Sequence, residues 1–293
     1  MASAAEWLEG ARLRTLPAAI APVLMGSGAA LAVGGFDIWR GLLAVVVALA
    51  LQVGVNYAND YSDGIRGSDE VRVGPQRLVG SGAAQPHQVK AAAFGCFGIA
   101  ALAGLALVGI AGQWWLLIIG ALCVLAAWFY TGGKNPYGYR GLGEVAVFVF
   151  FGLVATLGTT YTQAGRLTAL AWLAALACGA LATAVLVANN LRDLPIDAQV
   201  GKLTLETKLG DAGSRRFYFA LVAIAVSSLI AMTLLGDWWL LLGVLAGLPL
   251  LAPACRQVAA GATGLDLVRV LKFTGLGELA AGVGIFIGCL IAF

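Results

Sequence analysis

Long apolar runs separated by short polar segments make up most of this 293-residue chain. A helix needs roughly 20 predominantly apolar residues to cross the hydrocarbon core of a bilayer. The runs allow nine such helices, and they lack the alternation that marks a transmembrane β-strand. The sequence therefore predicts an all-α membrane protein, a single nine-helix bundle over residues 1–293. The predicted spans are about 16–34, 41–59, 89–111, 114–130, 143–163, 168–190, 216–236, 238–254 and 274–293.

Composition agrees with this class. The chain is 60% hydrophobic and 11% charged, with a mean hydropathy of +0.90, whereas soluble domains are about 25% charged. Its 40 glycines allow helices to approach closely. The five cysteines are scattered in apolar runs without metal-ligand spacing, so we expect them to pack as small apolar residues. The net charge of +3 is small, and no nucleic-acid partner is expected.

The distribution of positive charge predicts the orientation of the bundle. Cytoplasmic loops of membrane proteins are enriched in Lys and Arg. All but two of the 18 Lys and Arg residues, Arg40 and Arg166, fall at the N-terminus or after the second, fourth, sixth and eighth spans. We therefore expect the N-terminus and these loops to be cytoplasmic. An odd number of spans then places the C-terminus outside.

Two polar clusters with nearly the same spacing follow apolar runs that lie far apart in the chain. Each has an Asn four residues before an Asp, and a second Asp three or four residues later, which places the three side chains along one helix face. An Asp at the bilayer centre costs about 2.5–3.5 kcal/mol even on mild insertion scales. Two such clusters on the cytoplasmic side therefore indicate a site for hard cations such as Mg²⁺. The clusters are Asn56, Asp60 and Asp63, and Asn189 or Asn190, Asp193 and Asp197.

Basic residues follow each cluster within the next loop. Arg72 and Arg77 come after the first, and Lys202 comes after the second. Carboxylates that hold a metal, together with cations that meet phosphate oxygens, are the groups that a Mg²⁺-bound diphosphate requires. Lys134 could add to them, although it equally suits a basic cytoplasmic loop. Arg12 is either a cytoplasmic anchor or a contributor to acceptor or lid contacts.

These motifs resemble the UbiA-type superfamily of intramembrane prenyltransferases, and the resemblance covers essentially the whole chain. Within the superfamily, the chain is most similar to the branch that prenylates 1,4-dihydroxy-2-naphthoate in menaquinone synthesis. The matching segments are Arg12-Leu13-Arg14-Thr15-Leu16-Pro17, the two clusters, Gly74-Pro75-Gln76-Arg77, Gly143-Glu144 and Gly201-Lys202-Leu203-Thr204-Leu205.

The resemblance implies a reaction and a location. A polyprenyl diphosphate would bind through Mg²⁺, with Mn²⁺ as a substitute, and ionise to an allylic cation that the naphthoate ring attacks with loss of CO₂. The enzyme would lie among lipids in the bacterial plasma membrane, crossing it many times, with its active site facing the cytoplasm.

The resemblance also implies roles for the candidate residues. The expected metal ligands are Asp60, Asp63, Asp193 and Asp197. These four aspartates and Lys202 are the expected catalytic residues. The expected diphosphate-binding residues are Asn56, Arg72, Arg77, Lys134, Asn190 and Lys202. Direct metal contact within the first cluster falls to either Asp60 or Asp63.

Two other functions are compatible with parts of the pattern. A sister prenyltransferase could use a different aromatic acceptor with the same acidic clusters. A transporter could also carry intramembrane acids, but transporter sites lie near the bilayer midplane. Both clusters here are predicted at cytoplasmic helix ends, which favours the prenyltransferase.

Overall fold

The computed structural model describes residues 2–67, 77–197 and 202–293, and all regular structure within them is helical. Most of the helices are long, and a π-helical segment, Phe148–Val154, joins α6 to α7. The α-helices are α1 (Ala4–Gly10), α2 (Pro17–Leu31), α3 (Ile38–Ile65), α4 (Pro86–Ala111), α5 (Leu116–Phe129), α6 (Gly143–Val147), α7 (Ala155–Ala164), α8 (Ala169–Asp197), α9 (Leu205–Leu235), α10 (Leu241–Ala259) and α11 (Leu265–Ala292). Short 3₁₀ turns lie at Leu13–Thr15, Tyr137–Arg140 and Trp238–Leu240.

Seven helical runs in the described part of the chain are long and apolar enough to cross a membrane. They are α3, α4, the continuous run Gly143–Ala164, α8, α9, Trp238–Ala259 and α11. The all-helical prediction is thus confirmed. Two further apolar helices, α2 and α5, have 15 and 14 residues. At 1.5 Å per residue they reach only about 22 Å, less than the roughly 30 Å hydrocarbon core, so the count of nine stays a prediction.

Two helices begin earlier than hydropathy predicts. Helix α9 starts at Leu205 rather than near 216, with a kink at Gly210, whose φ is +68°, and α11 starts at Leu265 rather than near 274. Polar interactions support the extra turns of α9 on both sides of that kink. The Thr204 side chain accepts from the backbone N–H of Thr207, and Asp211 pairs with Arg215 one turn later at 2.8 Å. Hydropathy detects the membrane-crossing part of a helix and not its charged extension.

Small residues bring the helices together around α8, which packs against α2, α7, α9 and α11. A Cβ atom on Gly152 would lie 2.4 Å from the Cα atom of Gly179 on α8. Likewise, a Cβ atom on Gly284 would lie 2.4 Å from the carbonyl oxygen of Leu242. Backbones that approach this closely tolerate only glycine, which is how membrane helices pack without large apolar knobs.

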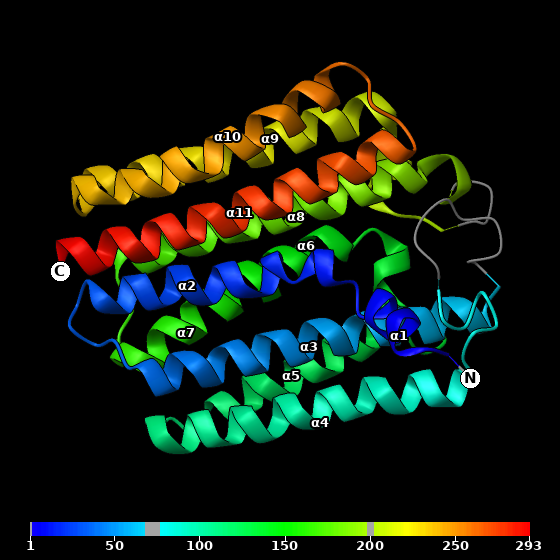
Figure 1. The fold of residues 1–293 in the computed structure, drawn as a ribbon, viewed down its shortest axis with the longest axis horizontal. Coiled ribbons are helices and arrows are strands. Elements are labelled where there is room, and N and C mark those ends of the chain that lie inside the picture. Colours follow the sequence, from blue (N-terminus) through cyan, green and yellow to red (C-terminus); the bar gives the residue numbers. More distant parts are fainter. Residues whose placement is uncertain (1, 68–76, 198–201) are drawn as a thin grey trace.

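The helices run roughly along one axis, with α4 on one side of the bundle and α9 and α10 on the other (Figure 1). The two chain termini lie at opposite ends of the bundle (Figure 1). Asp60 and Asp63 lie near the C-terminal end of α3, and Asp193 and Asp197 near that of α8. The fold brings these two helix ends to the same end of the bundle, where α1 also lies (Figure 1).

Candidate active site

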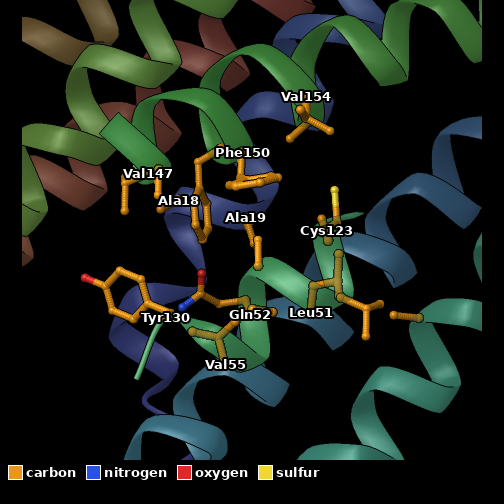
Figure 2. A pocket seen from close by; sticks show the side chains of 18 of the residues that line it. Ala18, Ala19, Leu51, Gln52, Val55, Cys123, Tyr130, Val147, Phe150 and Val154 are labelled. Atoms are coloured by element: carbon orange, nitrogen blue, oxygen red, sulfur yellow. The ribbon is translucent and has the colours of Figure 1, made fainter. Parts of the chain in front are cut away.

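A cavity of about 610 Å³ extends into the bundle from the end that carries the acidic clusters. Its lining on α3 runs from Ala44 to Asp63, which corresponds to about 28 Å of helix. Most of the wall is apolar, with side chains from α2, α3, α5 and the π-helical segment (Figure 2). Apolar lining residues include Ala18, Ala19, Leu51, Val55, Val147, Phe150, Phe151 and Val154.

Polar residues from both clusters meet at one end of this cavity. Among the described lining residues, Arg12, Arg77 and Lys202 carry positive charge, and Asp63 is the one acid. The excess of cations makes this end suitable for an anion, while the apolar wall suits a long hydrocarbon chain. The polar lining of the cavity comprises Arg12, Thr15, Gln52, Asn56, Asn59, Asp63, Arg77, Tyr130, Thr131, Tyr137, Tyr139, Thr159, Thr162, Asn189, Asn190, Lys202 and Thr204.

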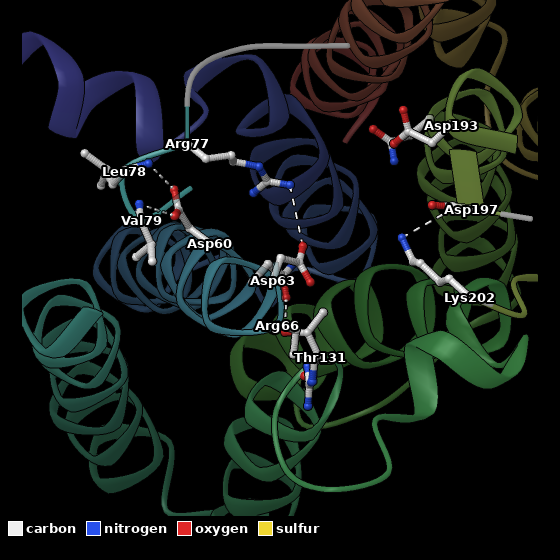
Figure 3. Close-up of polar contacts among 12 residues, drawn as sticks. Asp60, Asp63, Arg66, Arg77, Leu78, Val79, Thr131, Asp193, Asp197 and Lys202 are labelled. Carbon is white, nitrogen blue, oxygen red and sulfur yellow. Dashed lines mark hydrogen bonds and ion pairs between the residues drawn. The ribbon is translucent and has the colours of Figure 1, made fainter. Parts of the chain in front are cut away.

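The first cluster is held mainly by partners that are distant in sequence. The Asn56 amide donates to the carbonyl oxygen of Ala11 at 2.9 Å and to the hydroxyl of Thr15 at 3.0 Å. Asp63 accepts a hydrogen bond from the hydroxyl of Tyr139. The Nη2 atom of Arg77 lies 3.7 Å from an oxygen of Asp63 (Figure 3).

The second cluster is held mainly by its neighbours in sequence. The Arg192 guanidinium donates to both oxygens of Asp193 at 2.7 Å, and to Asn189 at 2.9 Å. The Lys202 ammonium lies 3.5 Å from an oxygen of Asp197 (Figure 3). Asp193 and Arg192 are both buried, so this bidentate pair satisfies charges that would otherwise be costly inside the bundle.

The predicted site residues divide into those that line the cavity and those that do not. The cavity is lined by Asn56, Asp63, Arg77, Asn190 and Lys202. Asp60, Asp193 and Asp197 are buried beside it, without forming its wall. Lys134 is exposed and does not line the cavity. Arg72 falls outside the described residues.

Sequence reasoning missed Tyr139, which connects the two clusters. Its hydroxyl donates to Asp63, and its ring lies 5.2 Å from the Lys202 ammonium and 5.5 Å from the Arg66 guanidinium. Cations over an aromatic face are favourable by about 0.5–1 kcal/mol at exposed sites. The only signal in the sequence was a tyrosine in a glycine-rich loop, which does not show that the loop folds over the site.

Two buried glutamates behind the cavity wall were also missed as a unit. Glu144, which the sequence analysis named only within a segment that matches the family, accepts a hydrogen bond from the Asn190 amide at 2.8 Å. Glu206 is fully buried and lies within interaction range of Glu144 and Asn190. A buried acidic group thus backs the polar end of the cavity.

A divalent cation fits the chemistry of this end of the cavity if a substrate completes its coordination. Within the described residues, no three acidic, histidine or cysteine side chains gather as a ligand set. Mg²⁺ in proteins commonly uses one or two carboxylates together with substrate phosphates, rather than an all-protein cage. Asp63, with the carbonyl oxygens of asparagines at the same cavity, offers hard oxygen donors of this kind.

Comparison with known proteins agrees with this picture. The model of the UbiA prenyltransferase family matches residues 19–274. The chain is 52% identical, over 95% of its length and 94% of the relative, to 1,4-dihydroxy-2-naphthoate octaprenyltransferase of Mycobacterium tuberculosis. It is 38% identical, over 98% of its length and 95% of the relative, to the enzyme of the same name from Escherichia coli.

Solved structures share the fold at low sequence identity. A UbiA homologue from Aeropyrum pernix has a TM-score of 0.72 and 17% identity, over 93% of this chain and 97% of that chain. A UbiA homologue from Archaeoglobus fulgidus, solved with GPP and Mg²⁺ bound, has a TM-score of 0.61 and 12% identity, over 96% of this chain and 99% of that chain.

Proposed function

Because this chain belongs to the UbiA prenyltransferase family, we propose that it transfers a polyprenyl group from an isoprenoid diphosphate to 1,4-dihydroxy-2-naphthoate. The products are demethylmenaquinol, CO₂ and diphosphate, in menaquinone synthesis. The near full-length relatives that carry this activity in their names support the acceptor. The transporter alternative has no support, since those relatives are prenyltransferases.

One observation carries the proposal: a single cavity joins a cationic end to a long apolar wall. A polyprenyl diphosphate has the same two parts. We place its diphosphate near Arg77 and Lys202, with Asn56 and Asn190 as hydrogen-bonding neighbours, and its tail along the wall that contains Phe150. Arg72 stays a proposed phosphate ligand from the sequence alone.

We propose Asp60, Asp63, Asp193 and Asp197 as the protein's ligands for Mg²⁺. The cation, when bound, would neutralise charge that develops on the departing diphosphate. Asp193 and Asp197 now pair with Arg192 and Lys202, so these ion pairs would have to rearrange when the substrate is bound. Mn²⁺ as a substitute stays a prediction.

The protein's own groups account for the remaining chemistry. As the C–O bond of the donor breaks, its electron pair passes to the diphosphate, and Arg77 and Lys202 stabilise that anion. The apolar wall excludes water, which would otherwise capture the allylic cation. The acceptor ring then forms the new C–C bond, and the electron pair of its C–CO₂⁻ bond returns to the ring as CO₂ leaves.

We further propose that the shorter helices α2 and α5 complete nine membrane crossings. The termini lie at opposite ends of the bundle, as an odd number of crossings requires (Figure 1). Lys and Arg concentrate on the side of the acidic clusters, which supports an active site facing the cytoplasm of a bacterial plasma membrane.

The test uses purified full-length protein in detergent, with a polyprenyl diphosphate and 1,4-dihydroxy-2-naphthoate, with Mg²⁺ or with EDTA. Mass spectrometry should detect a prenylated naphthoquinol that has lost the carboxyl group, formed only with Mg²⁺. If a product forms only with a different aromatic acceptor, the assignment as a prenyltransferase would stand and the assignment to menaquinone synthesis would be wrong.

A matched pair of lysine variants tests the placement of the diphosphate. Lys202→Ala removes the positive charge beside the diphosphate. This variant should lower kcat/KM by about 100-fold, as the loss of one charged transition-state contact does. Lys90→Ala removes an exposed lysine whose ammonium lies 5.7 Å from the rings of Tyr61 and Trp128, and it should leave kcat/KM unchanged. Equal kcat/KM values for the two lysine variants would contradict the placement of the diphosphate beside Lys202.

A further inference from the structure

Among the described residues, Arg12 is the one lining cation that precedes α2. It lies between α1 and the 3₁₀ turn before α2, and its side chain forms part of the cavity wall. Of the other two lining cations, Arg77 lies 3.7 Å from Asp63. Lys202 lies 3.5 Å from Asp197 (Figure 3). Arg12 therefore brings its charge to the cavity from an element that carries neither acidic cluster.

The backbone at Arg12 has an unusual conformation. Its φ is +54°, and no other non-glycine residue in the described ranges has a positive φ. In this left-handed region the Cβ atom crowds the backbone, so a glycine or an asparagine would be less strained there. Strained residues of this kind collect at functional sites. An arginine at this position therefore calls for an explanation beyond the turn itself.

Hydrogen bonds hold this turn against α3. The carbonyl oxygen of Arg12 accepts from the backbone N–H of Thr15 at 2.8 Å and from its hydroxyl at 2.9 Å. The Thr15 hydroxyl oxygen accepts in turn from the amides of Gln52 and Asn56, each at 3.0 Å. Gln52 is itself part of the cavity wall (Figure 2). The backbone that carries Arg12 is thus fixed at the level of Gln52 and Asn56 on α3.

This level is deeper in the cavity than that of Arg77. Arg77 lies beside Asp63, which is two helical turns beyond Asn56 on α3, or about 10 Å along the axis. The Arg12 guanidinium lies within electrostatic range of Asp60, between these two levels, so its charge is close to the reacting end of the donor. The allylic carbon of the donor carries the diphosphate, and the acceptor meets that carbon from the side away from the diphosphate. A cation deeper than Arg77 is therefore on the acceptor's side.

We propose that Arg12 binds the carboxylate of the naphthoate acceptor. This rests on the proposed function, which supplies the acceptor and the position of the diphosphate. A planar guanidinium can donate two parallel hydrogen bonds to a carboxylate, and this fixes the orientation of the ring as well as its position. The carboxylate-bearing side of the ring is then held toward the allylic carbon.

The same contact distinguishes the acceptor from the product. When the new C–C bond has formed, CO₂ leaves and the electron pair of the broken bond stays in the ring. The naphthoate anion and the allylic cation together give a neutral quinol and neutral CO₂. The product therefore lacks the anion that Arg12 binds, although its ring is unchanged. Hydrogen bonds to a charged group correspond to about 10–100-fold in affinity, so loss of the carboxylate favours release of the product.

The test measures two ligands that differ only by the carboxylate, 1-hydroxy-2-naphthoate and 1-naphthol. Equilibrium dialysis of the full-length protein in detergent gives the Kd of each, with Mg²⁺ and inorganic diphosphate present and no prenyl donor. The ratio of the two Kd values is the carboxylate preference. Uptake of the ligands by detergent is the same for every variant, so it cancels when the preferences of variants are compared. Calorimetry with Mg²⁺ and inorganic diphosphate reports the diphosphate site separately.

The variants are Arg12→Gln, Arg12→Lys, Arg77→Gln and Arg14→Gln. Arg12→Gln should lower the carboxylate preference about 10–100-fold, through weaker binding of the naphthoate and unchanged binding of naphthol. Arg12→Lys keeps the charge without the two parallel donors and should keep part of the preference. Arg77→Gln should weaken diphosphate binding and leave the preference unchanged. Arg14 is exposed and does not line the cavity, so Arg14→Gln is the matched control and should resemble the wild type.

Two results would overturn the inference. One is a wild-type carboxylate preference in folded Arg12→Gln, because another group would then hold the carboxylate. The other is an equal loss of preference in Arg77→Gln, because the carboxylate would then occupy the diphosphate site. If Arg12→Gln does not fold, Arg12→Gly takes its place, since glycine adopts a φ of +54° without strain.

The dialysis needs no turnover, so it separates this inference from the proposed function. A wild-type protein that prefers the naphthoate through Arg12 but transfers no prenyl group to 1,4-dihydroxy-2-naphthoate would overturn the proposed reaction and leave the contact in place. A wild-type protein that forms the prenylated product but shows no carboxylate preference would overturn the contact alone.

Discussion

The two acidic clusters have nearly the same spacing in sequence, yet the structure uses them differently. In the first, Asp60 binds the backbone of a distant segment and Asp63 accepts from Tyr139. In the second, Asp193 is held by the adjacent Arg192, and Asp197 lies beside Lys202. The difference teaches that equal spacing predicts a shared helix face, but not what each carboxylate touches.

The asparagines of the two clusters show the same contrast. Asn56 donates to Ala11 and Thr15, in the segment that follows α1. Asn190 donates instead to the buried carboxylate of Glu144. In both cases the amide nitrogen donates to the protein, and the carbonyl oxygen accepts only a long bond of 3.4 Å, from Gln52 in the first cluster and from Asn189 in the second.

The largest effect should come from the buried ion pair of the second cluster. Asp193→Ala leaves the Arg192 charge buried without its partner, which costs about 3–5 kcal/mol of stability, and it should also abolish prenyl transfer. Thermal unfolding in detergent and the transferase assay measure the two losses. Replacing both residues by leucine should recover much of the stability but none of the activity. Full activity in that double variant would show that Asp193 is structural only.

Tyr139 connects the clusters, so its hydroxyl should have an intermediate effect. Tyr139→Phe keeps the ring beside Lys202 and Arg66 but removes the donor to Asp63. Loss of one hydrogen bond to a charged group corresponds to about 1.5–3 kcal/mol, so we expect kcat/KM to fall about 10–100-fold. Steady-state kinetics over a range of Mg²⁺ concentrations measures this. Tyr137→Phe, at a second cavity tyrosine that instead donates to the carbonyl of Ala126, is the matched control and should keep its Mg²⁺ dependence.

The smallest effect should come from Glu144, which acts through Asn190. Glu144→Gln can still meet the Asn190 amide, but it no longer imposes one orientation, because a glutamine both donates and accepts. One such hydrogen bond contributes about 1 kcal/mol. We therefore expect KM for the polyprenyl diphosphate to rise about fivefold, with kcat nearly constant. A matched change in the first cluster, Thr15→Val, removes one of the two acceptors of the Asn56 amide and should give a similar rise. A large fall in kcat for Glu144→Gln would instead assign the glutamate a direct chemical role.

Much of the fold follows from hydropathy, because each membrane crossing needs an apolar run of a definite length. The all-helical fold was predicted on this basis. The starts of α9 and α11 were not, since both begin with charged turns; in α9 these turns are stabilised by the Thr204 cap and the Asp211–Arg215 pair. Helices α2 and α5 are also shorter than the predicted spans 16–34 and 114–130.

The candidate site shows where sequence reasoning ends. The clusters, the basic loops after them and the family resemblance together selected Asn56, Asp63, Arg77, Asn190 and Lys202, and all five line one cavity. They also selected Asp60, Asp193 and Asp197, which are buried without lining it, and Lys134, which is exposed. They gave no sign of Tyr139 or of the Glu144–Glu206 pair, because these residues reach the site only through loops and helix ends that pack together in three dimensions.

The sequence by itself therefore determined the membrane class, the helical architecture, the family resemblance and several residues of the polar end of the cavity. These properties depend on composition, on the length and periodicity of apolar runs, and on the spacing of residues within one helix. Only the tertiary structure decided that Asp60 faces the 78–79 backbone, that Tyr139 joins the clusters and that Glu144 holds Asn190. Those contacts join residues 18 to 76 positions apart, and their geometry depends on how whole helices pack, which no local pattern encodes.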